Sequence, residues 1–397
     1  MSAQELRASF SLASIFGLRL FGMFIILPVF ALYAEGLPGW NLTLVGIALG
    51  AYGLTQAAMQ VPFGWVSDRV GRKPVMIAGL AIFVAGSALC ALAQSPWAVI
   101  LGRTVQGAGA ISAVALAMAA DLTRPSQRTK SMAIIGSTIG LAFAASFVAA
   151  PFLQRAIGVP GIFALTGVLA LCAIAVVLWV VPAQPPARAA EARVPFAVVL
   201  RDPELARLNV GIFALHAVLM ALFVVVPLSL VRAGLPAGTH SGVYLGAVGT
   251  GFILMLPFVA LRRFARRERG VFLGAIAALG VSLAALAVAG DRRWPITLSL
   301  VIFFAAFNVL EAKLPALVSK AAPPSAKGAA SGVYSSVQFL GTFFGGAAGG
   351  AIAQHLGPMA VLAFCLAFTV VWLATAWPMA EPAARESDPQ EPQASNP

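Results

Sequence analysis

Charged side chains are scarce in this sequence. Only 10% of the 397 residues are Asp, Glu, Lys or Arg, whereas 60% are hydrophobic. A water-soluble domain typically has about 25% charged residues. A chain this apolar has too few polar groups to cover a folded surface in water, so the composition excludes the common soluble classes and predicts a protein of the lipid bilayer.

Cysteine and histidine are also few, with three residues of each. Cys90, Cys172 and Cys365 fall inside apolar runs and lack metal-ligand spacing, so we predict neither a disulfide framework nor a metal site. No pair of nucleophile and base, and no phosphate-binding loop, stands out. We therefore expect a protein that is not an enzyme and that needs no cofactor.

Long apolar runs, in contrast, are abundant. About 20 apolar residues suffice to cross a hydrocarbon core of roughly 30 Å. Twelve such runs are present, at about 10–34, 43–65, 75–94, 97–120, 130–154, 159–181, 208–232, 241–261, 270–290, 295–318, 328–353 and 358–379. The first is too long for a signal-peptide core and is expected to stay as a spanning helix. We predict an all-α membrane protein with twelve transmembrane helices.

One long polar insert, residues 182–207, separates the sixth run from the seventh. Positions on either side of it correspond at an offset of 199, for example Ser137 with Ser336 and Leu141 with Leu340. A parallel repeat of this kind predicts two six-helix bundles, residues 1–181 and 208–379, joined by a linker at 182–207. The acidic, proline-rich tail 380–397 is predicted to be disordered.

The net charge of +12 arises from 26 Lys and Arg against 14 acidic residues. Nucleic-acid binding requires basic residues massed on one surface, whereas here they are scattered among short loops. With both termini in the cytoplasm, 19 of the 26 fall on the cytoplasmic side, four on the opposite side and three inside spans. This bias predicts cytoplasmic termini and a multi-pass protein of a bacterial-type inner membrane.

The loop between the second and third runs, residues 64–74, reads GWVSDRVGRKP. Asp68 and Arg72 are four residues apart and would face each other on a helical turn. Asp121, at the end of the fourth run, could accept Arg72, and Asp68 could lie at the positive N-terminal end of the eleventh helix. We predict a conformational lock made of Gly64, Asp68, Arg69, Gly71, Arg72, Lys73 and Asp121. The alternative is that these charges only set the topology.

The equivalent segment of the second half, residues 262–270, lacks the aspartate. The sequence therefore predicts an asymmetric lock. Glycines four residues apart, which permit close helix contacts, occur in five runs. Four of these sets are Gly46 and Gly50, Gly136 and Gly140, Gly242 and Gly246, and Gly341, Gly345 and Gly349, and the ninth run has Gly270 and Gly274 as well. Ordinary glycine richness is the alternative interpretation.

Ionisable residues lie deep in only the first, fourth, seventh and tenth runs. A charge near the bilayer centre costs at least about 2.5 to 3.5 kcal/mol, so each one suggests a function. Glu311 is the only carboxylate well inside a run, and burial favours its neutral, protonated form. We predict a proton-coupling set of Glu311, His216, Arg103 and Arg19.

Alternatives are an ion pair of Glu311 with Arg19 or Lys313, and packing roles for His216 and Arg103. Lys313 projects about 200° away from Glu311 and is expected to reach the cytoplasmic surface.

These motifs resemble one family. The pattern G-x-x-x-D-R-x-G-R-K-P of residues 64–74 resembles the loop between helices 2 and 3 of the major facilitator superfamily. Residues 102–109, GRTVQGAG, are similar to the helix 4 motif that is associated with proton coupling in drug antiporters. The whole chain resembles the YajR-type transporters of the drug:proton antiporter branch. The resemblance implies a cavity lined by helices 1, 4, 7 and 10, and contacts of helix 2 with 11 and of helix 5 with 8.

Two features depart from that pattern. The helix 5 motif of drug antiporters continues with glycines, whereas this chain reads Ala149-Ala150-Pro151-Phe152-Leu153 there. YajR-type proteins also carry a soluble domain after the last helix, and this chain stops about eighteen residues beyond it. We therefore expect no regulation through such a domain.

Taken together, the sequence predicts a monomeric transporter that uses the proton gradient and alternating access. We expect it to export hydrophobic or amphiphilic small molecules by proton antiport, with the lipid bilayer, protons and that substrate as its partners. A soft apolar lining would come from Phe16, Met23, Phe213, Met220 and Phe304, with Asn308 among them. Alternatives are a proton-coupled importer or sugar exporter, and a membrane sensor that transports nothing.

Overall fold

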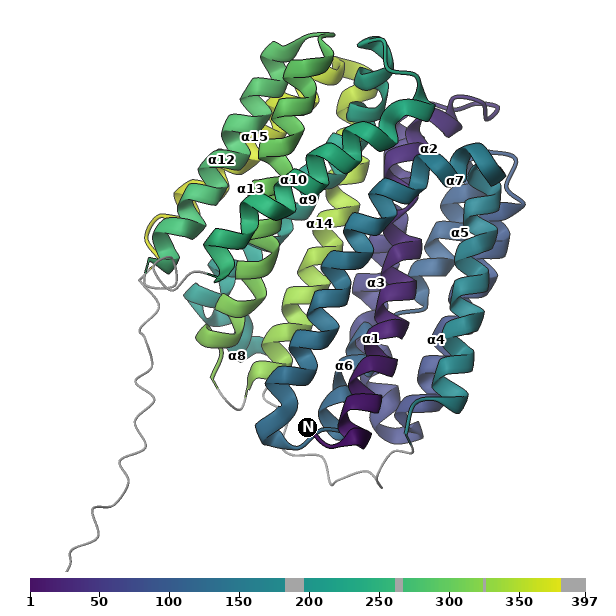
Figure 1. The fold of residues 1–397 in the computed structure, drawn as a ribbon, viewed down its shortest axis with the longest axis vertical. Coiled ribbons are helices and arrows are strands. Elements are labelled where there is room, and N and C mark those ends of the chain that lie inside the picture. The colour runs from purple at the N-terminus through teal and green to yellow at the C-terminus, as the bar shows by residue number, and fades with distance from the viewer. Residues whose placement is uncertain (183–195, 261–266, 324–325, 380–397) are drawn as a thin grey trace, which may run out of the picture.

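A computed structural model gives the structure of residues 1–182, 196–260, 267–323 and 326–379. These residues form helices and turns, and no strand occurs among them. The long helices run side by side in two groups, with the first half of the chain on the right and most of the second half on the left (Figure 1). The N-terminus lies at the lower end, which is the predicted cytoplasmic end. The predicted fold of two six-helix bundles is therefore confirmed.

The first bundle is built from seven α-helices and one short 3-10 helix. They are α1 (Ala3–Phe24), α2 (Leu27–Ala34), α3 (Leu42–Val70), α4 (Arg72–Ala91), α5 (Pro96–Ala108), α6 (Ser112–Asp121), η1 (Pro125–Gln127) and α7 (Arg128–Trp179). The first and fourth spans are each broken into two helices, so α1 with α2, and α5 with α6, make one span apiece. Gly158, with a φ of 67°, divides α7 into the fifth and sixth spans.

The second bundle begins earlier than the sequence predicts. Its helices are α8 (Phe196–Arg201), α9 (Pro203–Arg232), η2 (Ala237–Thr239), α10 (His240–Ala260), α12 (Glu268–Ala289), α13 (Arg293–Ala321), α14 (Lys327–Leu356) and α15 (Pro358–Ala376). Asp202 starts α9 by accepting hydrogen bonds from the backbone N–H groups of Glu204 and Leu205. Residues 196–207 of the predicted linker are thus largely helical, whereas 183–195 and the predicted disordered tail 380–397 lie outside the described residues.

Ten segments in the described ranges are long and apolar enough to cross a membrane. One of them, Lys130–Trp179, contains two spans because Gly158 interrupts it. The glycine-rich α14 is 30 residues long but is not among the ten, since Ser, Gln and Gly lower its hydropathy. With these two adjustments, each of the twelve predicted runs corresponds to a helical span.

The two bundles meet along a backbone-to-backbone seam between α3 and α14. A Cβ atom added at Gly46 would overlap the carbonyl oxygen of Gly346 and approach the Cα of Gly350. A Cβ at Gly53 would similarly overlap the carbonyl oxygen of Phe339. Glycine is therefore required where the second and eleventh spans touch, the pair of helices for which the resemblance implies a contact.

The partner glycines on α14 differ from those predicted, however. Gly341, Gly345 and Gly349 face α9, where added Cβ atoms would overlap the backbone of Phe213, Ala217 and Ala221. The residues that meet α3 are instead Gly346 and Gly350, one position further along the helix. Two adjacent glycine faces thus let α14 pack closely against its own bundle and against the other bundle at once.

The predicted close contact through the glycines of the fifth and eighth spans is wrong. Helices α7 and α10 do pack together. Nevertheless, an added Cβ atom would meet nothing within 4 Å at Gly136, Gly242 or Gly246, and at Gly140 it would meet only the ring of Phe252, at 3.5 Å. Here aromatic side chains fill the space between the helices.

The seam gives a first testable prediction. The substitution Gly46→Ala forces the α3 and α14 backbones apart and should destabilise the folded protein by about 1–3 kcal/mol, the usual range for overpacking. Gly242→Ala is the matched control, because the added methyl group meets open space. Thermal unfolding of the purified proteins in detergent checks this, and equal melting temperatures for the two variants would contradict a tight seam.

Candidate functional site

The predicted proton carrier Glu311 faces two polar side chains of neighbouring helices. Its Oε2 atom on α13 lies 3.9 Å from Nε2 of His216 on α9. Gln338 on α14 places its amide nitrogen 2.9 Å from the same His216 nitrogen and 3.4 Å from Glu311 Oε1. Glu311 therefore points into the second bundle and not toward lipid.

The hydrogen bonds of His216 fit one neutral tautomer. Nδ1 lies 3.3 Å from the carbonyl oxygen of Ile212, which can only accept, so this nitrogen carries the proton. Nε2 is then free to accept the amide N–H of Gln338. In this arrangement His216 is uncharged, and its contact with Glu311 is not an ion pair. The alternative ion pair of Glu311 with Arg19 or Lys313 is not formed either, because those two side chains have other partners.

Several polar atoms beside Glu311 have no hydrogen-bond partner within the described structure. They are Glu311 Oε2, Asn308 Nδ2 and the hydroxyl of Tyr334. Asn308 lies one helical turn before Glu311 on α13, and Tyr334 one turn before Gln338 on α14. Buried polar groups are nearly always bonded, so these three groups are candidates to exchange a proton or to bind a polar group of a substrate.

A packed group of aromatic rings lies on the outer side of Glu311, and we refer to it as the aromatic plug. Its members are Phe143 and Phe147 of α7, Phe223 of α9, Tyr244 of α10, and Phe304 and Phe307 of α13, all of them buried. Phe143 and Phe307 stack with ring centroids 5.3 Å apart, and Phe147 meets Phe223 at 4.9 Å. The plug joins the two bundles, and one turn of α13 separates it from Glu311.

The predicted apolar lining is largely packed in this structure. Phe304 belongs to the aromatic plug, and the side chains of Phe16, Met23, Met220 and Asn308 are buried. Phe213 lies against Phe344 and Phe368 of α14 and α15, at centroid distances of 5.4 and 6.3 Å. A lining role for these residues remains a prediction.

Arg19 belongs to a separate cluster in the first bundle. Its guanidinium donates hydrogen bonds to the Ser112 hydroxyl at 3.0 Å and to the Gly109 carbonyl oxygen at 2.9 Å, and a third to the side-chain oxygen of Gln56. Gly109 ends α5, so the cation lies at the negative C-terminal end of that helix. The break between α5 and α6, which the sequence did not reveal, thus supplies the carbonyl group that Arg19 binds.

Arg103 lies near Arg19 and shares an aromatic partner with it. Nη1 donates to Gln106 Oε1 at 3.0 Å, and the guanidinium carbon lies 4.9 Å from the centre of the Tyr52 ring. The Arg19 guanidinium carbon lies 5.8 Å from the same centre. The four predicted coupling residues therefore form two groups, an arginine pair in the first bundle and Glu311 with His216 in the second.

The loop between α3 and α4 forms the contacts that the sequence predicts for Arg72. This side chain makes an ion pair with Asp68 and lies 3.1 Å from Asp121, measured from Nε to Oδ2. Lys73 donates to the carbonyl oxygen of Val181 at 2.7 Å, which ties the loop to the end of the sixth span. The predicted position of Asp68 at the start of α14 remains a prediction.

The remaining residues of the predicted lock shape the loop. Gly71 ends α3 with a φ of 102°, a conformation that favours glycine. The Arg69 guanidinium stacks over the ring of Trp65, 3.6 Å from its centre. Gly64 lies opposite α6, where an added Cβ atom would be 3.8 Å from the Cβ of Ala113. The motif thus fixes one tight turn between α3 and α4 and the contacts that hold this turn to α6 and to the end of the sixth span.

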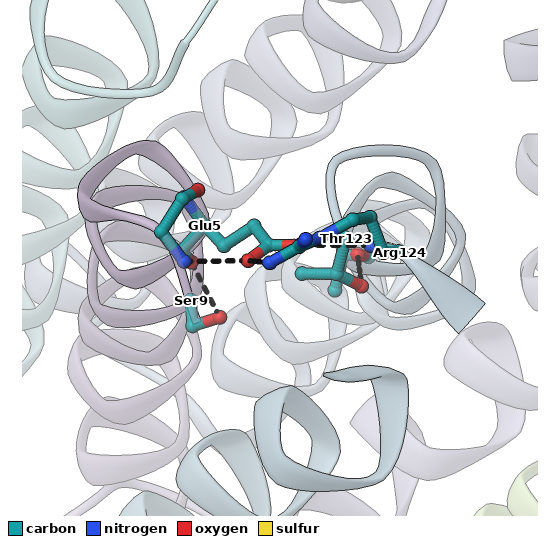
Figure 2. A network of polar contacts seen from close by, with 6 residues as sticks. Glu5, Ser9, Thr123 and Arg124 are labelled. Atoms are coloured by element: carbon teal, nitrogen blue, oxygen red, sulfur yellow. Dashed lines mark hydrogen bonds and ion pairs between the residues drawn. The ribbon is translucent and has the colours of Figure 1, made fainter. Parts of the chain in front are cut away.

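A second network at the same end was missed by the sequence analysis. Figure 2 shows Glu5 of α1 beside Arg124, which follows α6. The carboxylate accepts hydrogen bonds from the Arg124 backbone N–H at 3.0 Å and from Nε and Nη2 at 2.9 and 3.1 Å. Ser2 and Glu5 also form a capping box at the start of α1. The pattern S-x-x-E could have revealed the cap, but no local signal indicates Arg124.

The second half also contains charged contacts that the sequence did not predict. Lys313, expected at the surface, is buried, and its Nζ lies 3.6 Å from Glu268 Oε1. Lys320 Nζ lies 2.6 Å from Glu268 Oε2. A carboxylate on α12 therefore holds two lysines of α13, and Lys313 stays inside because this partner is available there.

Comparisons with known proteins support one family. A model described as Major Facilitator Superfamily matches residues 12–346 and 267–397. The chain is 41% identical over 386 residues to the inner membrane transport protein YajR of Escherichia coli (strain K12), covering 96% of this chain and 85% of that protein. It is 30% identical over 376 residues to an uncharacterized transporter of Buchnera aphidicola subsp. Baizongia pistaciae, covering 93% and 95%. A shorter match, 33% over 131 residues, covers 30% of this chain and 33% of the multidrug resistance protein MdtH of Yersinia enterocolitica.

Solved structures share the fold at low sequence identity. The human organic anion transporter MFSD10 (TETRAN) aligns with a TM-score of 0.69 at 18% identity, covering 95% of this chain and all of that one. The nucleoside transporter NupG aligns with a TM-score of 0.73 at 14% identity, covering 94% of this chain and all of that one. From the paired helical bundles, the family match over most of the sequence and the likeness to YajR, we conclude that the chain is a multi-pass membrane transporter, not an enzyme, and belongs to the Major Facilitator Superfamily.

Proposed function

We propose that this protein exports hydrophobic or amphiphilic small molecules across the inner membrane in exchange for protons, by alternating access. The observation that carries the proposal is Glu311, a carboxylate in the middle of a span that faces His216 and Gln338. A carboxylate inside a membrane protein has a high energetic cost and therefore suggests a function, and proton relays are among the functions that such carboxylates serve.

The geometry around Glu311 provides two alternative hydrogen-bond arrangements. When Glu311 is ionised, Gln338 donates to Oε1 and also reaches His216 Nε2. When Oε2 carries a proton, that O–H becomes a donor, and His216 Nε2, 3.9 Å away before any adjustment, can accept it. Gln338 would then lose its hydrogen bond to His216. Proton binding thereby changes a contact between α9, α13 and α14, and this is the link to movement that antiport requires.

In this proposal the aromatic plug separates the two sides of the membrane. It lies on the outer side of Glu311 and joins α7 of the first bundle to α9, α10 and α13 of the second. Rings held by stacking contacts alone can part without breaking hydrogen bonds. We propose that the plug opens during export and that its rings, with Phe16, Met23, Phe213 and Met220, then offer the apolar lining. The partial likeness to MdtH, a multidrug resistance protein, supports this substrate class.

The arginine pair and the lock have supporting roles in this proposal. Arg19 bridges α1, α3 and the break between α5 and α6, so it links three spans of the first bundle. Arg72 fastens the start of α4 to the end of α6 through Asp121. These contacts would keep the first bundle rigid while it rocks against the second, and Asp68 would hold the cytoplasmic side shut through α14.

The proton role is tested with Glu311→Gln, which keeps the shape of the side chain and removes its proton site. In inverted vesicles with an imposed pH gradient, we expect lipophilic cations, dyes or other amphiphiles to trigger proton release in the wild type. The variant should lose at least about 90% of this release while remaining folded, since a missing carrier removes coupling altogether. Glu204→Gln, in a surface ion pair with Arg207, is the control and should behave like the wild type.

If Glu311→Gln retains normal coupling, Glu311 is not the carrier. If a folded wild type responds to no compound in the panel, export of amphiphiles is wrong, and a symporter, a sugar exporter or a non-transporting sensor takes its place. Proton-driven uptake would identify the symporter, and export of sugars that compete with one another would identify the sugar exporter.

The lock is tested with Asp68→Asn, which removes a negative charge from Arg72 and from the proposed contact with α14. Transport should fall several-fold, because the state closed to the cytoplasm loses a stabilising contact of about 1 kcal/mol. Single cysteines placed on the cytoplasmic halves of α3 and α14 should react faster with a water-soluble maleimide. Wild-type labelling rates would count against the lock.

A further inference from the structure

The second bundle contains a charge-reversed equivalent of the lock. Arg72 is the first residue of α4, and it binds Asp121, the last residue of α6. Glu268 is the first residue of α12, and it binds Lys320, one residue before the end of α13. The offset of 199 relates Asp121 directly to Lys320. The lock is therefore not absent from the second half, as the missing aspartate suggests, but has its signs exchanged.

The attachment of the loop to the last helix of each bundle is repeated as well. In the first bundle, Lys73 donates to the carbonyl oxygen of Val181, just after α7 ends. In the second, Arg269 donates to the carbonyl oxygen of Trp377 at 2.6 Å, just after α15 ends. Both cations lie one residue after the ion-paired residue that starts their helix. Two separate contacts thus support the equivalence of the loops.

Lys313 is the feature that the first bundle lacks. It lies seven residues before Lys320, which is about two turns of α13, so both lysines project from the same side of the helix toward α12. The exposed fractions of the side chains are 9% for Lys313, 11% for Glu268 and 55% for Lys320. The inner contact is therefore a buried ion pair, and the outer one is at the surface.

The buried pair lies next to Glu311 along the chain but on the other side of the helix. Lys313 follows Glu311 by two residues, which corresponds to about 200° around the helix axis. One side of α13 is thus held against α12 by Glu268, and the opposite side presents Glu311 to His216 and Gln338. A rotation of α13 that altered the surroundings of Glu311 would necessarily stretch the contact between Lys313 and Glu268.

We infer that Glu268 and Lys313 are positioning residues that hold Glu311 at its place opposite His216, so that proton binding is tied to substrate movement. The inference rests on the proposed proton-coupled function. Neither residue needs to carry a proton itself. Their ion pair restricts the rotation of α13, and Lys320 fastens the same helix at its end.

The test uses the double variant Glu268→Gln with Lys313→Met. Removing only one partner would leave a buried unpaired charge, a strongly destabilising change, whereas removing both leaves a neutral contact of similar size. Lys320 also loses its carboxylate partner in this variant, but its side chain is half exposed and stays solvated. The control is Glu204→Gln with Arg207→Met, which removes the same two signs of charge from a surface ion pair of 2.9 Å in the same bundle. Both proteins are studied as full chains in proteoliposomes.

The decisive measurement is the number of protons released per substrate molecule transported. A purely structural role would lower the amount of folded protein but leave this ratio unchanged. We expect the ratio to fall by about three- to thirtyfold in the double variant, the range expected when a coupling contact is lost, and to stay at the wild-type value in the control. A folded double variant with the wild-type ratio overturns the inference.

A second measurement keeps the inference testable if the proposed function fails, that is, if the wild type itself moves no protons. Hydrogen–deuterium exchange of the inner part of α13, residues 308–320, is then compared in detergent. Faster exchange in Glu268→Gln with Lys313→Met, and not in the control, supports the positioning role. Equal exchange in both variants overturns it.

Discussion

Inside a bilayer no water is present to solvate a polar side chain, and this constraint determines where every ionisable residue of the spans lies. Arg19 satisfies it with a helix end, a hydroxyl and an amide. Lys313 satisfies it with a carboxylate that it shares with Lys320. Glu311 satisfies it only in part, because its Oε2 atom, like the Nε atoms of Arg19 and Arg103, has no hydrogen-bond partner in the described structure. Unlike the two guanidinium groups, a carboxylate readily changes its protonation state.

Close packing, more than hydrogen bonding, connects the two bundles at two places. Along the seam of α3 and α14, glycines bring two backbones together, and the contact of Gly46 with Gly346 involves no side chain. On the other side of the molecule, rings such as Phe143 and Phe307 stack between α7 and α13. Such contacts are short-ranged and apolar. They permit two rigid bundles to move against each other more readily than a network of directional hydrogen bonds would.

Much of this arrangement could be predicted from the sequence, because the bilayer imposes long apolar runs and makes each buried charge conspicuous. The twelve spans follow from the lengths of the apolar runs, and the contact of Arg72 with Asp121 follows from their places at the ends of neighbouring spans. Partners that depend on tertiary structure could not be predicted. Gln338 looks like any amide on a helix, and only packing brings it to His216.

Local breaks in the helices could not be predicted from the sequence either. Nothing in the apolar run 97–120 indicates that α5 ends at Ala108 and leaves the carbonyl group of Gly109 for Arg19. The glycines of α14 illustrate the limit of spacing arguments, since two interleaved sets share one helix and the sequence cannot tell which set faces which neighbour. Lys313 was misplaced for a similar reason: its carboxylate partner lies 45 residues earlier in the chain.

The reversed signs of the two locks also bear on the history of the chain. If the halves arose by duplication, each loop has since changed together with the helix end that it binds. A loop copied from the second half into the first would place the carboxylate equivalent to Glu268 near Asp121, and like charges would meet. The reverse exchange would bring arginine toward Lys320. Gene conversion between the halves would therefore be selected against, and the two copies are free to diverge toward separate tasks.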